Sequence, residues 1–170
     1  MSINKKIILL SIFIPIMSIS NVFAEDLKKV GKFKDWDVMV MTEASGKVCF
    51  AQSSPVLQAP KKNKRDARLF ITFRPSEKIS NEISATAGYE FNKNNTVLAT
   101  SGNNKFKFDI MQQGFAWMTS NKKENIMVKV MKKGSRIMVT GYNEKGSQTI
   151  DHYSLLGFTK AYNTAKKTCS

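Results

Sequence analysis

Short stretches in which apolar and polar residues alternate constrain the fold of this chain more than any other feature. The clearest is residues 105–110, in which every second residue from Phe106 onward is Phe or Ile and the others are charged. Residues 69–74 repeat the pattern, with Leu69, Ile71 and Phe73 on one side. Because successive side chains of a strand point to opposite faces, this alternation is typical of strands with one buried face.

Turns and further extended segments make the chain mainly β. Ser101-Gly102-Asn103-Asn104 predicts a hairpin between residues 96–100 and 105–110, and a turn at residues 143–146 predicts another between 135–142 and 147–155. Further strands are expected at residues 36–41, 47–53, 69–74, 81–91 and 115–119. Residues 25–34 and 55–68 are expected to lack regular structure.

Two helices are expected within this framework. Residues 121–133 begin with Asn121 as the cap, answered by Glu124, and end before Gly134. The apolar stripe of this helix is expected to be Ile126, Met127, Val130 and Met131. Residues 158–168 form the second helix. About eight strands and two helices, without a repeat or a linker, predict a β-sandwich or barrel.

The first 24 residues have the three parts of a secretory signal. Lys5 and Lys6 precede an apolar stretch, residues 7–19, and Val22-Phe23-Ala24 places small residues where signal peptidase requires them. A stretch of about 13 apolar residues is shorter than the roughly 20 that cross a bilayer, so cleavage is favoured over a retained anchor. We expect cleavage after Ala24. Residues 25–170 would then form a single domain in the periplasm, at the cell surface or secreted by a Gram-negative bacterium, without integral membrane insertion.

The chain contains two cysteines, Cys49 and Cys169. Because an exported chain folds in an oxidising compartment, this pair is expected to form a disulfide. It would close a loop of about 120 residues and restrict the unfolded chain by about 4–5 kcal/mol. A redox-active or metal-binding pair is the alternative, but the chain has no Cys-x-x-Cys and one His. No cofactor and no metal site are expected.

Lysine dominates the charge of the chain. With 27 basic and 13 acidic residues the formal charge is +14, and it falls to +12 when Lys5 and Lys6 leave with the signal. Such a field favours anionic partners, here an envelope or host-surface glycan, alongside an unknown protein. Nucleic acid is not expected in an exported compartment. The candidate anionic-ligand contacts lie in the exposed loop before residue 68: Lys61, Lys62, Lys64 and Arg65. Only four basic residues are Arg, which favours general solubility over a dedicated polyanion site as the interpretation of the charge.

Catalytic signatures are sparse. The single histidine, His152, is expected on the solvent side of its strand, and Asp151 beside it points the other way, so the two cannot form a dyad. Asp35 and Asp37 flank Trp36 and could share a strand face at a spacing that suits paired glycosidase carboxylates. An envelope hydrolase therefore remains an alternative, while a non-catalytic protein is expected.

A series of short motifs runs in order along the chain after the signal. It comprises Asp35-Trp36, residues 46–52 around Cys49, Phe73-Arg74-Pro75, residues 81–84 and 87–91, Ala116-Trp117, residues 132–135, and residues 153–158. The ordered set resembles the invasion-associated locus B family of exported alphaproteobacterial proteins, in a shorter form with two cysteines. One departure is Lys34, where family members commonly have Gly.

The resemblance implies an all-β, immunoglobulin-like β-sandwich with one inserted short helix and a C-terminal helix. It also implies no recognised catalytic centre, and only Cys49 and Cys169 map as a functional feature. The expected function is that of a non-catalytic binding or interaction protein in the periplasm or at the cell surface, including host-cell interaction. A structural or stress-protective envelope protein is a further alternative.

Overall fold

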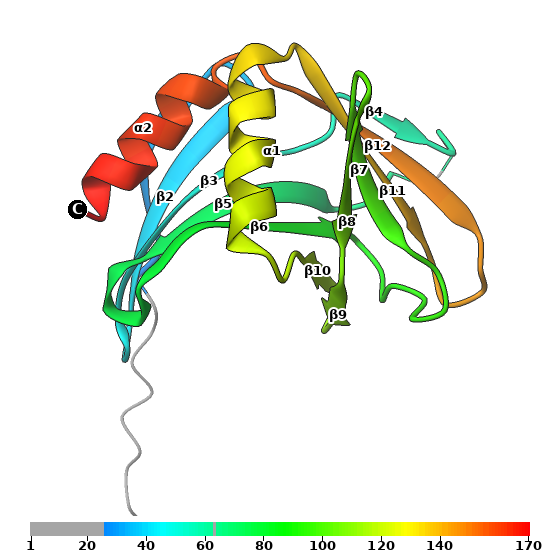
Figure 1. The fold of residues 1–170 in the computed structure, drawn as a ribbon, viewed down its shortest axis with the longest axis horizontal. Helices are drawn as coiled ribbons and strands as arrows, with labels where there is room; N and C mark the ends of the chain where they lie inside the picture. The colour runs from blue at the N-terminus through cyan, green and yellow to red at the C-terminus, as the bar shows by residue number, and fades with distance from the viewer. Residues whose placement is uncertain (1–25, 63) are drawn as a thin grey trace, which may run out of the picture.

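Two antiparallel sheets form most of the chain over residues 26–62 and 64–170, which this computed structural model describes (Figure 1). The larger sheet contains β1 (Lys28–Phe33), β2 (Trp36–Glu43), β3 (Gly46–Ser53), β5 (Ala67–Arg74), β6 (Ile79–Ala87), β9 (Ile110–Gln112) and β10 (Phe115–Trp117). The smaller sheet contains β4 (Leu57–Ala59), β7 (Val97–Ser101), β8 (Asn104–Phe108), β11 (Arg136–Tyr142) and β12 (Gln148–Ser154). Their spatial orders are β1-β2-β3-β5-β6-β10-β9 and β4-β12-β11-β7-β8. The predicted signal and its cleavage after Ala24 lie outside the described residues and stay predictions.

Two helices share a layer with the smaller sheet. α1 (Asn121–Lys133) joins β10 to β11, and α2 (Phe158–Thr168) follows β12; a 3-10 turn, Pro75–Glu77, precedes β6. Figure 1 shows both helices on the same side of the larger sheet as the smaller sheet, with α2 over β2 and β3 and α1 beside β6. The inner face of the larger sheet is therefore covered by three neighbours, which all leave its outer face open. The predicted immunoglobulin-like β-sandwich with an inserted and a C-terminal helix is confirmed.

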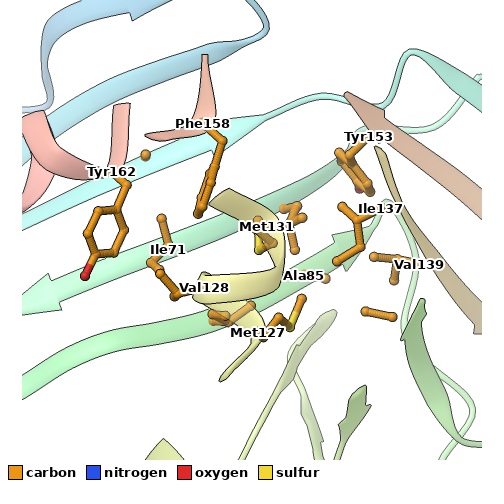
Figure 2. Close-up of a cluster of buried hydrophobic side chains, with 14 of the residues drawn as sticks. Ile71, Ala85, Met127, Val128, Met131, Ile137, Val139, Tyr153, Phe158 and Tyr162 are labelled. Atoms are coloured by element: carbon orange, nitrogen blue, oxygen red, sulfur yellow. The ribbon is translucent and has the colours of Figure 1, made fainter. Parts of the chain in front are cut away.

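Side chains from all of these parts meet in one core (Figure 2). Each of the following is at most 1 % exposed: Ile71 and Ala85 of the larger sheet, Met127 and Met131 of α1, Ile137 and Tyr153 of the smaller sheet, and Phe158 of α2. Burial of one large apolar side chain contributes about 1.5–3 kcal/mol, so α1 is held mainly by its two methionines and their neighbours. Within the described chain, no helix is long and apolar enough to cross a membrane.

The turn between β1 and β2 packs against the start of α2. The Trp36 indole N–H donates to the Ser154 carbonyl oxygen at 2.9 Å, and its ring lies 4.9 Å from that of Phe158. The Asp35 N–H donates to the Leu156 carbonyl oxygen at 3.3 Å. Two motifs at opposite ends of the series that carried the family resemblance are thus neighbours in the fold.

Two residues of this contact have left-handed backbones. Lys34 has φ 55°, a conformation that Gly adopts with less strain than any other residue. Gly157 has φ 88°, and a Cβ there would overlap the Phe33 carbonyl oxygen. Gly157 is therefore required by both its conformation and the close approach of another strand.

The predicted strand at residues 105–110 is shorter in the structure. Phe106 and Phe108 are buried as expected, but β8 ends at Phe108. The Asp109 N–H donates to the Trp117 carbonyl oxygen at 2.8 Å, which carries the chain over to the larger sheet. Ile110 then begins β9 and is 45 % exposed, so its expected place in the core is wrong.

The cap and apolar stripe of α1 also differ from expectation. Ser120, not Asn121, is the cap, and its Oγ accepts the Lys123 N–H at 3.4 Å. Glu124 is buried, and its carboxylate accepts the Ile83 N–H of β6 at 2.9 Å. This bond turns the buried side of the helix toward Glu124, Met127, Val128 and Met131, and leaves Ile126 44 % exposed.

Candidate interaction surface

Aromatic side chains gather on the outer face of the larger sheet. Side chains alternate between the two faces along a strand. The residues that precede or follow the core residues Ala51, Leu69, Ile71 and Ala116 in the chain therefore point outward. Outward positions on β3, β5 and β10 hold Phe50, Phe70, Phe115 and Trp117. The Phe50 and Phe70 ring centroids lie 6.0 Å apart, those of Phe70 and Phe115 5.9 Å, and those of Phe115 and Trp117 5.3 Å. A continuous row of rings therefore crosses the sheet.

The rings line a shallow groove. One hollow of 330 Å³ is bordered by this row together with Met41, Val48, Glu43, Arg74 and Glu82. A neighbouring hollow of 530 Å³ shares Phe70 and Phe115 and extends to Arg68, Thr86, Tyr89 and Glu90. We call these two hollows together the aromatic groove. The helices and the smaller sheet lie on the other side of the larger sheet and leave the groove open.

Carboxylates outnumber free cations around the aromatic groove. Arg74 is engaged by Glu43 at 3.0 and 3.1 Å and lies 4.0 Å from Glu82. Arg68 is engaged by Asp66 at 2.9 Å. The groove thus carries surplus negative charge, at Glu82 and Glu90, on a chain whose formal charge is +14.

The predicted basic loop divides into two parts. Lys61, Lys62 and Lys64 are exposed, as an anion-binding loop requires. Arg65 is turned inward and donates to the two Asp151 carboxylate oxygens at 2.6 and 2.9 Å. Its side chain is 10 % exposed and that of Asp151 is 2 % exposed. Arg65 is therefore not available to an external anion, because its guanidinium is paired with buried Asp151 and connects the loop to β12.

The two carboxylates of the hydrolase alternative have different surroundings. Asp35 lies in the exposed β1–β2 turn, whereas Asp37 lies on β2 and pairs with Lys29 at 2.7 Å. His152 is half-buried and lies on the face of β12 opposite Asp151. The two side chains therefore point away from each other, as the alternation along the strand predicted. Among the described residues, no three His, Cys, Asp or Glu side chains gather as metal ligands would.

Cys49 and Cys169 form a disulfide, as predicted, with sulfur atoms 2.06 Å apart. The bond joins β3 to the residue that follows α2, and both cysteines are buried. The Lys47 ammonium adds a hydrogen bond to the Thr168 carbonyl oxygen at 2.8 Å at the same place. The pair is therefore a structural link between the C-terminal helix and the sheet it covers.

The aromatic groove was not anticipated from the sequence. The alternation in residues 69–74 places Phe70 opposite Leu69 and Ile71, which already indicates an outward aromatic ring. What a single strand cannot show is that β3 lies next to β5, that β10 lies beyond β6, and that both contribute further rings. The signal available was the recurrence of Phe and Trp at outward positions of several expected strands.

Together, the two packed sheets, the covering helices and the buried disulfide define a disulfide-linked β-sandwich protein. The chain belongs to the invasion associated locus B (IalB) family, whose model matches residues 36–166. Among solved structures, the crystal structure of invasion associated protein B from Bartonella henselae is similar, with a TM-score of 0.57 and 12 % identity over 81 % of this chain and 96 % of that chain. At that identity the likeness concerns the fold. A search of curated proteins gave no significant match.

Proposed function

We propose that this chain is an exported, non-catalytic interaction protein of the periplasm or cell surface that binds a protein partner in the aromatic groove. The observation that carries the proposal is the row of four rings left open on the outer face of the larger sheet. Aromatic side chains bury large apolar areas at low entropic cost, and some of them are enriched among the residues that dominate binding energy in protein interfaces.

The groove also indicates the chemistry of the partner. Its rings favour apolar or aromatic side chains on the partner. Its surplus carboxylates, Glu82 and Glu90, favour a Lys or Arg of the partner beside them. A polyanion would be repelled here although the chain as a whole is basic. The partner is therefore a protein segment with apolar anchors flanked by positive charge.

Export and the lack of catalysis rest on separate support. A buried disulfide needs an oxidising compartment to form, and family membership agrees with one. Asp35 and Asp37 have different surroundings, since Asp35 is exposed in a turn and Asp37 is half-buried on β2 and paired with Lys29. A binding role, including one at a host cell, fits these observations better than an envelope hydrolase.

Selection from a displayed random-peptide library tests the groove. Peptides captured by the disulfide-bonded protein should be enriched in aromatic and basic residues together. Their affinity should fall at least tenfold with Phe70→Ser or Trp117→Ser and severalfold with Glu82→Gln, with folding checked by thermal melting. Leu57→Ser, which removes an exposed apolar side chain elsewhere, is the matched control. Binding that ignores both groove variants would refute the proposal.

Exposed Lys61, Lys62 and Lys64 support a second candidate, an anionic envelope or host-surface glycan as the ligand. Salt-sensitive glycan-array binding that is lost in the triple Lys→Gln variant, and retained in Phe70→Ser, would favour this candidate. A third outcome is a structural or stress-protective role. Deletion of the gene would then weaken the envelope, and both sets of variants would restore it fully.

A further inference from the structure

The exposed sides of α1 and α2 form a second surface with one sign of charge. α1 carries five lysines in 13 residues and α2 carries three in 11. The two helices lie side by side (Figure 1). We define the helical basic face by its exposed lysines: Lys122, Lys129, Lys132 and Lys133 of α1, with Lys166 and Lys167 of α2.

This charge is not neutralised within the fold. The one carboxylate of the two helices, Glu124, is buried and bonded to the Ile83 N–H. The ion pairs found over residues 26–62 and 64–170 involve none of the lysines of the helical basic face. The face is therefore free to attract an external anion.

Helix stability does not account for all of these lysines. Lys132, Lys133, Lys166 and Lys167 occupy last turns, where positive charge is favourable. Lys122, in contrast, lies in the first turn of α1, where it opposes the helix dipole. Burial and, less strongly, Lys166 lower the pKa of Lys132, whose Nζ lies 3.8 Å from the centre of the Tyr162 ring. Lys132 and Lys166 thus bring two positive charges together where α1 and α2 meet, and an anion is favoured there.

Exposed apolar side chains lie among the lysines. Ile126 follows Lys122 by one helical turn and precedes Lys129, and it is 44 % exposed. Leu156, 62 % exposed, lies where α2 begins beside the end of α1, since the Leu155 N–H donates to the Ser135 carbonyl oxygen at 3.0 Å. Lysines around exposed apolar residues are typical of helices that lie on a bilayer interface, because the apolar groups reach the acyl boundary while the ammonium groups stay at the phosphates.

We propose that the helical basic face binds the surface of an anionic phospholipid bilayer, with its lysines on the headgroup phosphates and Ile126 at the acyl boundary. This surface lies across the larger sheet from the aromatic groove, so its role is independent of the proposed protein partner. Binding is peripheral, and the core stays closed.

Vesicle co-sedimentation of the disulfide-bonded protein tests the proposal. Binding to phosphatidylcholine vesicles containing about 30 % phosphatidylglycerol should be strong at 0.1 M salt and weak at 0.5 M, and absent with phosphatidylcholine alone. Because each lysine near such a surface is worth roughly fivefold, Lys129→Gln/Lys133→Gln/Lys166→Gln should weaken binding about 100-fold. The matched control, Lys61→Gln/Lys62→Gln/Lys64→Gln, removes the same charge from the loop and should change binding by less than about fivefold.

Ile126→Ser separates a bilayer from a soluble polyanion. It should weaken vesicle binding about tenfold and leave binding to long-chain polyphosphate unchanged. Equal losses in the two triple variants would show that net charge alone governs binding and would overturn the proposal. Equally strong polyphosphate binding together with no effect of Ile126→Ser on vesicles would replace the bilayer by a soluble polyanion.

Discussion

At Gly157 two requirements coincide that are usually met separately. Its φ of 88° favours Gly, and its hydrogen atoms allow the Phe33 carbonyl oxygen to approach. Gly146 has a similar φ, 78°, but open space around it. A substitution at Gly146 therefore tests the cost of the backbone conformation alone, whereas one at Gly157 adds the cost of close packing.

We expect Gly157→Ala to lower the free energy of unfolding by at least about 2–4 kcal/mol, because the added methyl group must displace the β1–β2 turn. Gly146→Ala should cost about 1–2 kcal/mol from conformation alone. Urea unfolding curves of both variants provide the comparison. Equal costs would mean that the β1–β2 turn yields without penalty.

The Arg65–Asp151 pair offers a second prediction at this scale. Arg65→Met leaves the buried Asp151 carboxylate unpaired, and should cost about 3–5 kcal/mol. The double variant Arg65→Met/Asp151→Leu should recover much of that loss, since neither charge is then buried. A cost below about 1 kcal/mol for the single variant is what an exposed ion pair contributes, and it would mean that Arg65 is an exposed residue of the basic loop.

Among the elements, α1 shows how a polar group can set which side of a helix is buried. The sequence pattern favoured Ile126, Met127, Val130 and Met131, because the stripe was inferred from apolar residues alone and Glu124 was expected to serve the helix cap. The structure instead buries Glu124 on a β6 amide, and the apolar stripe turns with it. Val128, expected to be exposed, is therefore buried, and Val130, expected to be buried, is only half-buried.

We expect Val128→Ala to destabilise the protein by about 1–2.5 kcal/mol, because Val128 is buried against the core. Val130→Ala should cost less than about 1 kcal/mol, because Val130 is only half-buried. Thermal and urea unfolding measure both variants. The reverse order would favour the stripe inferred from the sequence.

The buried Glu124 carboxyl predicts a pH dependence. Burial raises its pKa above the ordinary 4.5, and the Ile83 N–H offsets this only in part. The folded state therefore binds the proton more tightly than the unfolded state, and this contribution to stability is lost as pH rises from 4.5 through the raised pKa. Glu124→Gln cannot ionise, so its stability relative to the natural chain should increase over that window. Urea unfolding from pH 4 to 8 tests this, with exposed Glu144→Gln as the control for net charge.

Strand faces could be predicted because alternation is local, whereas strand partners and edges could not. Leu69, Ile71 and Phe73 are buried as their spacing indicates. β1 and β4 were missed because these edge strands bury little and their sequences are charged or short. Ile110 was misplaced because alternation continues unchanged where the chain passes from one sheet to the other. The aromatic groove depends on which strands are neighbours, which no single segment encodes.

For the whole molecule, the Cys49–Cys169 disulfide fixes the C-terminal helix to the larger sheet. Cys49→Ala/Cys169→Ala should lower the free energy of unfolding by about 2–4 kcal/mol, because the unfolded chain is no longer closed. Urea unfolding without reductant measures the loss. Thiol titration of the denatured natural protein should find no free thiol, and two free thiols would contradict the bond.

The same bond has a mechanical consequence. Under a pulling force applied between Ser170 and β1, the disulfide prevents the 120-residue stretch between the cysteines from extending, because that stretch is bridged covalently. Only residues 26–49 could unravel, which limits extension to roughly 80 Å, whereas reduction would release roughly 400 Å more. The disulfide therefore limits how far the domain can be stretched between these two points.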